Sequence, residues 1–132
     1  MTAEDLRKVS GGVIGHFTPK EIVVDIAKDT ALGAVGSNAL GLKVPANKFV
    51  VGAYIKNVDN DLASGGSATV AVTVGDDASA TLTATTLVNL KGKGACAIKT
   101  APAFYQAEQE VKLTVATAGL TAGKLTVGII YA

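Results

Sequence analysis

The sequence has no tryptophan and few aromatic residues of any kind. Its 132 residues include three Phe and three Tyr. Pockets for sugars and drug-like ligands are usually lined with aromatic rings, so this scarcity argues against such a pocket. Cysteine is scarcer still, because Cys96 is the only one. A framework of disulfides within the chain is therefore excluded, and the composition is compatible with a reducing compartment.

Charge of either sign is sparse and forms no block. Twelve basic and eleven acidic residues leave a formal net charge of +1. Nucleic-acid-binding proteins normally carry a basic stripe, so we expect no nucleic-acid partner. No apolar run approaches the roughly 18 residues of a membrane span, and the charged start MTAEDLRK lacks the apolar core of a signal peptide. We expect no membrane partner and synthesis in a cytoplasm.

Small and β-branched residues take the place of the missing types. The chain holds 22 Ala, 16 Val, 15 Gly and 14 Thr, and 48% of its residues are hydrophobic. These side chains suit thin, closely packed sheets. The length fits one folded domain.

The first 20 residues differ from the rest of the chain. Residues 2–9 are the only plausible helical stretch, and Gly11 and Gly12 would end it. So short a helix is not stable alone. We interpret residues 1–20 as an N-terminal arm, either loosely ordered or docked on a neighbour, and residues 21–132 as a β-sandwich domain.

From residue 21 onward, apolar residues recur at every second position, as in strands. Turn formers separate the runs, and residues 102–110 are expected to form a longer connection that carries Phe104 and Tyr105. The expected strands are 21–27, 39–44, 48–57, 68–74, 79–85, 87–90, 95–99, 111–117 and 124–131.

Eight or nine short strands with frequent turns predict an all-β, two-sheet sandwich or barrel. The absence of helices between the strands favours a jelly-roll-like sandwich of about eight strands over a parallel α/β fold. An immunoglobulin-like sandwich is the main alternative, although its Cys…Trp…Cys spacing is missing.

A search for catalytic groups finds no constellation. The only histidine, His16, lies in the arm and not on the sheet framework, so we expect a structural or surface role for it. Cys96 alternates with Ile98 in a strand, which predicts a buried small hydrophobe and not a reactive thiol. We expect no catalytic residue, no cofactor and no enzymatic activity.

Metal-binding and phosphate-binding patterns are also weak. Acidic residues at 59–61 and 76–77 do not match a calcium-binding loop and are ordinary turn chemistry. Glu108 and Glu110 could share a strand face but fit a solvated loop better. The run 91–94, KGKG, lacks the strand–loop–helix setting of a phosphate site and is interpreted as a turn. We expect no metal.

Several strands carry apolar residues on both faces, for example where Ile129 is followed by Ile130. In so small a protein, such a strand suggests that its second face meets another copy. The run 124–131 is the most apolar, so we expect it at the centre of a homo-oligomer. The predicted interface residues are Leu125, Val127, Ile129, Ile130 and Tyr131.

Four segments carry a resemblance to a known group of proteins. The runs 42–47 (LKVPAN), 49–55 (FVVGAYI), 67–75 (SATVAVTVG) and 120–127 (LTAGKLTV) resemble a pattern common in small tailed-phage virion proteins. The resemblance is to head-decoration (cement) and head-fibre subunits, and it spans roughly residues 22–132. It implies a β-rich, often trimeric bacteriophage structural protein on the capsid surface.

The leading hypothesis is thus a capsid decoration protein, a homotrimer that binds the major capsid protein and stabilises the head. It would be made in the host cytoplasm and end in the virion. Arm contacts to the shell or a neighbour are predicted for Leu6, Val9, Val13, Ile14 and Phe17. The alternative is a receptor- or glycan-binding fibre or tail module, with binding loops at 59–66 and 102–110. The position in head, neck, tail or fibre is left open.

Overall fold

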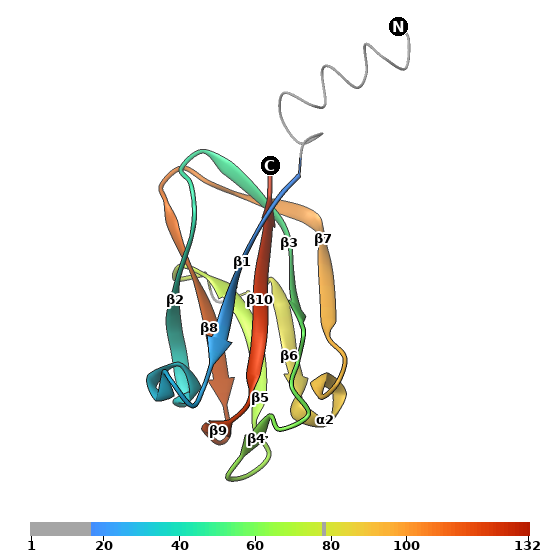
Figure 1. Ribbon diagram of the computed structural model, residues 1–132. Helices are drawn as coiled ribbons and strands as arrows, with labels where there is room; N and C mark the ends of the chain where they lie inside the picture. The colour runs from blue at the N-terminus through green and yellow to red at the C-terminus, as the bar shows by residue number, and fades with distance from the viewer. Residues whose placement is uncertain (1–16, 78) are drawn as a thin grey trace, which may run out of the picture.

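Two four-stranded sheets face each other and form a sandwich (Figure 1). The computed structural model describes residues 17–77 and 79–132, so the helical stretch expected at 2–9 and most of the arm lie outside the described residues. The strands are β1 (Thr18–Asp25), β2 (Gly36–Val44), β3 (Lys48–Lys56), β4 (Ala63–Ser64), β5 (Thr69–Val74), β6 (Leu82–Thr86), β7 (Ala95–Tyr105), β8 (Gln109–Ala116), β9 (Leu120–Ala122) and β10 (Lys124–Tyr131). Two helical turns are η1 (Thr30–Gly33) and α2 (Leu87–Leu90).

The strand order is that of a jelly roll. One sheet is β1-β10-β3-β7, the other is β2-β8-β5-β6, and a two-stranded sheet joins β4 to β9. Every pair is antiparallel. If the two short strands β4 and β9 are left out, the remaining eight strands are numbered one to eight along the chain. One sheet then has the order 1-8-3-6 and the other 2-7-4-5, which is the strand order of a jelly roll. This arrangement confirms the prediction of an all-β, two-sheet sandwich.

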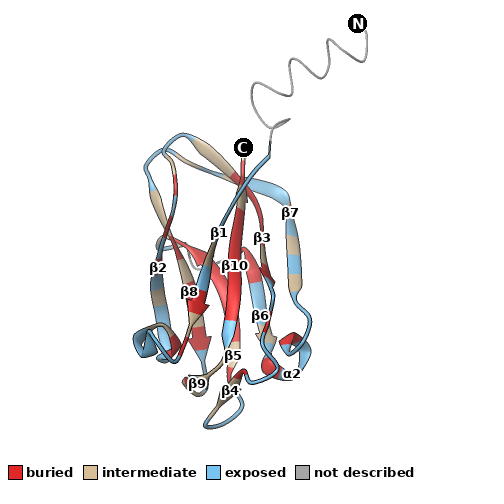
Figure 2. Cartoon of the chain, in the orientation of Figure 1, coloured by how far each residue is buried: buried red, intermediate tan, exposed pale blue. Residues whose placement is uncertain are grey.

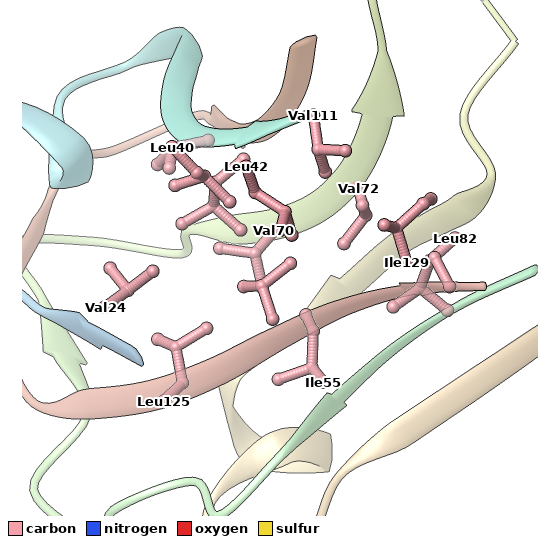
Figure 3. Close-up of a cluster of buried hydrophobic side chains, with 14 of the residues drawn as sticks. Val24, Leu40, Leu42, Ile55, Val70, Val72, Leu82, Val111, Leu125 and Ile129 are labelled. Carbon is pink, nitrogen blue, oxygen red and sulfur yellow. The ribbon is translucent and has the colours of Figure 1, made fainter. Parts of the chain in front are cut away.

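The core is a layer of aliphatic side chains between the two sheets. Along each central strand, alternate residues point inward, as the pleat requires. Leu125, Val127 and Ile129 of β10 are fully buried against Val70 and Val72 of β5 and their neighbours. Figure 3 shows Leu125 and Ile129 from one sheet converging with Val70 and Val72 from the other. Figure 2 shows β10 buried over most of its length.

Two expectations about elements were wrong. Residues 87–90 form a single helical turn and not a strand. Leu87 and Leu90 are both buried, and a spacing of three places them on one face of a helix. Residues 102–110 are mostly strand, because β7 runs to Tyr105 and β8 begins at Gln109. Pro102 fits β7 because this strand lies at a sheet edge, where the missing N–H costs no sheet hydrogen bond.

β1 begins at Thr18, within the segment expected to be the arm. Thr18 pairs with Tyr131, so the described chain starts beside its own C-terminus (Figure 1). Among the described residues, no helix has the length and apolar character needed to cross a membrane.

Two neighbouring isoleucines on β10 provide a test of the two faces. We expect Ile129→Ala to lower the free energy of unfolding by about 3 kcal/mol, because Ile129 is fully buried and leaves a cavity. Ile130 points to the outside and is only half-buried, so Ile130→Ala should cost less than about 1.5 kcal/mol. Urea unfolding followed by circular dichroism measures both, and equal losses would contradict the register of β10.

Candidate interaction surface

The outward-facing side chains of the β1-β10-β3-β7 sheet form rows that cross the four strands. The register defines three rows: Pro19, Ile130, Gly52 and Ile98; then Glu21, Gly128, Tyr54 and Cys96; then Val23, Thr126 and Lys56. Phe49 pairs with Phe104 beyond the first row, and it also exchanges two backbone hydrogen bonds with Ala132, each of 2.9 Å. We call this surface the outer face.

The half of the outer face nearest Thr18 and Ala132 is apolar. Ile98 is 64% exposed and Phe104 is 47% exposed. The Phe49 and Phe104 rings are 5.0 Å apart and tilted by 53°, which is a favourable aromatic geometry. None of the outward residues here is charged. We define the apolar half by the residues Pro19, Phe49, Ile98, Phe104 and Ile130.

Two glycines make room for large side chains on this face. A methyl group at Gly128 would overlap the Tyr54 ring, so the ring lies directly over the backbone of β10. At Gly52, a methyl group would meet the Ala97 carbonyl oxygen 2.6 Å away and the Ile98 side chain 2.8 Å away. Glycine in a strand interior often marks such a close approach. The aromatic ring shields the glycine backbone from water, an arrangement that also stabilises designed sheets.

A polar network holds the Tyr54 ring in place. The Tyr54 hydroxyl donates a 2.5 Å hydrogen bond to Glu21 Oε2, and Lys56 Nζ lies 3.0 Å from the same oxygen. The hydrogen bond from Tyr54, and then that from Lys56, lowers the pKa of Glu21. Burial first, and Glu21 second, raises the pKa of Tyr54 to about 12. The network spans β1 and β3 across β10 and therefore fixes three strands together.

The outer face of the β2-β8-β5-β6 sheet has a different character. Ser37, Thr114 and Thr73 form a chain of hydroxyls with oxygen separations of 2.9 and 3.1 Å. Lys112 Nζ lies 3.6 Å from a carboxylate oxygen of Asp76 beside them. This surface is polar, although Thr73 itself is buried. The two outer faces of the sandwich thus differ sharply in polarity.

The structure divides the five residues predicted to form an oligomer interface. Leu125, Val127 and Ile129 are fully buried in the chain's own core, and Tyr131 is 7% exposed. Only Ile130 lies on the outer face. From the sequence, the five side chains are expected to pack against another copy of the chain. In the structure, Leu125, Val127, Ile129 and Tyr131 pack against the second sheet of the same chain, so their apolar character does not require an interface.

The predicted arm contacts fall mostly outside the described residues. Leu6, Val9, Val13 and Ile14 belong to that undescribed part, as does His16. Phe17 is described and is 62% exposed, immediately before β1. The arm contacts stay a prediction.

The prediction of a buried Cys96 was wrong. Cys96 is exposed and lies opposite Tyr54 in the register of β3 and β7. The inward positions of β7 are those of Ala95 and Ala97, which pack against the core. Both alternating sets in this strand are apolar, so the sequence could not show which set faced inward.

The acidic loops are turns in the structure. Asp59 Oδ1 accepts a 2.8 Å hydrogen bond from the backbone N–H of Asp61, and Asp77 Oδ1 accepts one of 3.0 Å from Ser79. These are ordinary turn interactions. Across residues 17–77 and 79–132, no group of three His, Cys, Asp or Glu residues could hold a metal ion.

The remaining candidate groups are separate from one another. Glu108 lies 3.7 Å from Lys43, whereas Glu110 is part of β8. Residues 91–94 join α2 to β7. An open cleft of about 430 Å³ lies between the β4 region and α2, lined by residues that include Ser64, Thr86 and Lys91. It has no carboxylate, thiol or imidazole on its walls.

The two loops proposed for glycan binding do not share a surface. Tyr105 accepts a backbone hydrogen bond from Asn47 at the end where the chain terminates, whereas Asp59 bonds to Lys124 at the opposite end (Figure 1). The Tyr105 hydroxyl is also engaged, since it donates a 2.7 Å hydrogen bond to Asp77 Oδ2.

Comparison with solved structures gives three similar chains, all from phage capsids. One is in the acidic stable capsid structure of Helicobacter pylori bacteriophage KHP30, with a TM-score of 0.59 and 12% identity over 87% of this chain and 86% of that one. The second is in the capsid of Ralstonia phage GP4, with a TM-score of 0.52 and 21% identity over 89% and 84%. The third is in the cyanophage Pam1 capsid asymmetric unit, with a TM-score of 0.54 and 20% identity over 88% and 82%.

No protein-family model matches the chain, and no curated protein matches it. At 12–21% identity, the three likenesses show a shared fold. Each alignment covers most of both chains, so the likeness extends over nearly the whole sandwich.

The raised pKa of Tyr54 predicts an alkaline limit to stability. A tyrosine whose folded pKa is about 12, against an ordinary value of 10.0, contributes stability that is complete below pH 10 and is lost as the pH rises through 12. Tyr105, also raised to about 12, acts in the same direction. Absorbance titration at 295 nm should show both hydroxyls ionising near pH 12, and Tyr54→Phe should remove one of them. Ionisation of Tyr54 near pH 10 would contradict the network.

The contact between Tyr54 and Gly128 gives a second test. Gly128→Ala should displace the ring and lower the free energy of unfolding by about 1–3 kcal/mol. In a Tyr54→Ala background the same change should cost much less, because the obstructing ring is gone. Gly65→Ala is the control, since nothing lies within 4 Å of the added methyl group. Equal costs in both backgrounds would show that the ring does not occupy this space.

Proposed function

We propose that the chain is a structural, non-catalytic component of a phage capsid that acts by binding. The observation that carries this proposal is the likeness of the whole domain to chains in three phage capsids, over 82–86% of each of those chains. The neighbours are therefore proteins of about the same size and are made of the same jelly roll. Fold alone does not define function, but jelly rolls are frequent among capsid proteins.

The surface of the chain supports a binding role. Ile98 and Phe104 are exposed on a face that has no outward charge near them, and such apolar surface is characteristic of interaction sites. Aromatic residues are common at the energetic centres of interfaces. The titratable side chains that the described residues bring into contact form turns, isolated ion pairs, the hydrogen bond between Tyr105 and Asp77, and the network of Tyr54, Glu21 and Lys56.

The finer proposal is a decoration or cement protein. Homotrimers would sit on the capsid surface over joints between copies of the major capsid protein and would stabilise the head. The apolar half would be covered in the assembled state, whereas the hydroxyl-rich face around Thr73 and Thr114 would stay in water. The resemblance of residues 22–132 to head-decoration subunits supports this assignment.

The glycan-binding alternative has less support. It required residues 59–66 and 102–110 to form one surface, and they lie at opposite ends of the sandwich. Its aromatic pair is also committed, because Phe104 packs on Phe49 and Tyr105 bonds to Asp77.

Sedimentation of the purified chain with empty shells of its own phage tests the proposal. We expect the chain to sediment alone as an oligomer larger than the 13.2 kDa monomer, and to bind shells up to a fixed number of copies per particle. Unlabelled protein should compete with labelled protein, which separates specific sites from adhesion. A monomer at micromolar concentration would refute the oligomer, and failure to sediment with shells would refute the capsid role.

A further inference from the structure

We propose that the apolar half of the outer face receives the N-terminal segment, residues 1–16, of a neighbouring copy of the chain. This inference rests on the proposed homo-oligomer, and it names the surface and the occupant that hold the copies together. Four features support it: the uncovered apolar surface, the place where the chain emerges, the reach of the segment and its composition.

The apolar half is an uncovered part of the outer face. Its outward rows contain Pro19, Ile130 and Ile98, followed by the pair Phe49 and Phe104. The neighbouring row begins the polar network, in which Glu21 and Lys56 neutralise each other. An uncharged apolar surface gains free energy when apolar side chains displace water from it.

The chain emerges at the same end of the sandwich. Thr18 pairs with Tyr131, and Phe49 bonds to Ala132, so the start of β1 and the aromatic pair lie at the same end of the sheet, with β10 between β1 and β3 (Figure 1). Phe17, the first described residue, is 62% exposed there. β1 runs away from this end, so the segment before Phe17 is attached at the edge of the apolar half.

The length of the segment is sufficient. Sixteen extended residues span up to about 50 Å, at 3.3 Å per residue. An eight-residue strand such as β1 is about 26 Å long at the same rise. The segment can therefore leave one sandwich and still cross the outer face of the next.

The composition of the segment matches the surface. Its apolar residues include Leu6, Val9, Val13 and Ile14. Its charged side chains, two acidic and two basic, cancel, so it brings no net side-chain charge to an uncharged surface. If every copy gives one segment and receives one, the contacts are head-to-tail, and such contacts close into a ring when the rotation permits.

Cross-linking to the native cysteine tests the proposal in the full-length chain. Cys96 is exposed, is the only cysteine and lies in the row next to Ile98. We expect a Val13→Cys variant to form a covalent link between position 13 of one copy and Cys96 of another, under mild oxidation or with a short bismaleimide. Denaturing gels should show covalent oligomers, and mass spectrometry should identify the 13–96 peptide pair.

Two controls define the link. The double variant Val13→Cys, Cys96→Ser has its only thiol at position 13, so any cross-link that it forms joins the N-terminal segments of two copies. Adding Val88→Cys to that background places a thiol at a position that is 74% exposed but lies on α2, away from the apolar half. It should not cross-link. A 13–96 link found only within monomers, or no 13–96 link, would overturn the proposal.

A matched pair of surface variants gives an independent readout. Ile98→Lys should raise the dissociation constant of the oligomer by at least about tenfold, because a charge would enter the apolar half. Val23→Lys alters the same outer face in its far row, where Val23 is 59% exposed, and should change the constant by less than about twofold. Phe104→Ser replaces Ile98→Lys if circular dichroism shows the latter to be unfolded.

The results separate this proposal from the proposed function. If the chain forms oligomers and binds shells but Ile98→Lys and Phe104→Ser associate normally, the docking surface is wrong and the capsid role stands. If the unmodified chain is a monomer and does not bind shells, the proposed function fails, and the docking of segments between copies fails with it.

Discussion

The antiparallel register of β10 with β1 and β3 decides which side chains build the core and which build the outer face. It pairs Val127 with Ile22 on one side and with Ile55 on the other, so that three strands point their branched residues at the opposite sheet. A slip of one residue would turn Thr126 and Gly128 into the core. The aliphatic layer is one side chain deep on each sheet and could not tolerate that exchange.

The same register fixes the outer face as a consequence. Gly128 faces outward because Val127 and Ile129 face inward, and the space above its backbone is filled by the Tyr54 ring. The hydroxyl of that ring bonds to Glu21, which pairs with Lys56, so the polar network exists only in this alignment. The network bridges β1 and β3 over β10 and thus opposes the slip that would destroy the core.

Much of the fold could be predicted because the period-two pattern is strong on central strands. Residues 124–131 were expected to form a strand, and they form β10. The turn at Pro45 and the loop after Asn57 predicted the two ends of β3 to within one residue. The pattern fails at the sheet edge. In β7 both alternating sets are apolar, so Cys96 and Ile98 gave no sign that they faced outward.

The candidate surface was the hardest part to foresee, because it depends on pairing between distant strands. Residues 49 and 104 are far apart in the sequence, and nothing local shows that their rings meet. The glycines at 52 and 128 were the available signal, since a glycine inside an apolar strand often marks a close approach. Without the register, however, neither could be assigned its covering side chain.

The contrast between the two outer faces bears on how such a domain can serve an assembly. The hydroxyl chain from Ser37 to Thr73 already makes its hydrogen bonds within the β2-β8-β5-β6 sheet. Burying it would lose water contacts and add few new bonds. Burying the apolar half removes water from Ile98 and Phe104 and leaves no charge unpaired, since Glu21 and Lys56 on the rest of the outer face pair with each other. If the sandwich associates as proposed, the difference in polarity between its two outer faces favours association through the β1-β10-β3-β7 side.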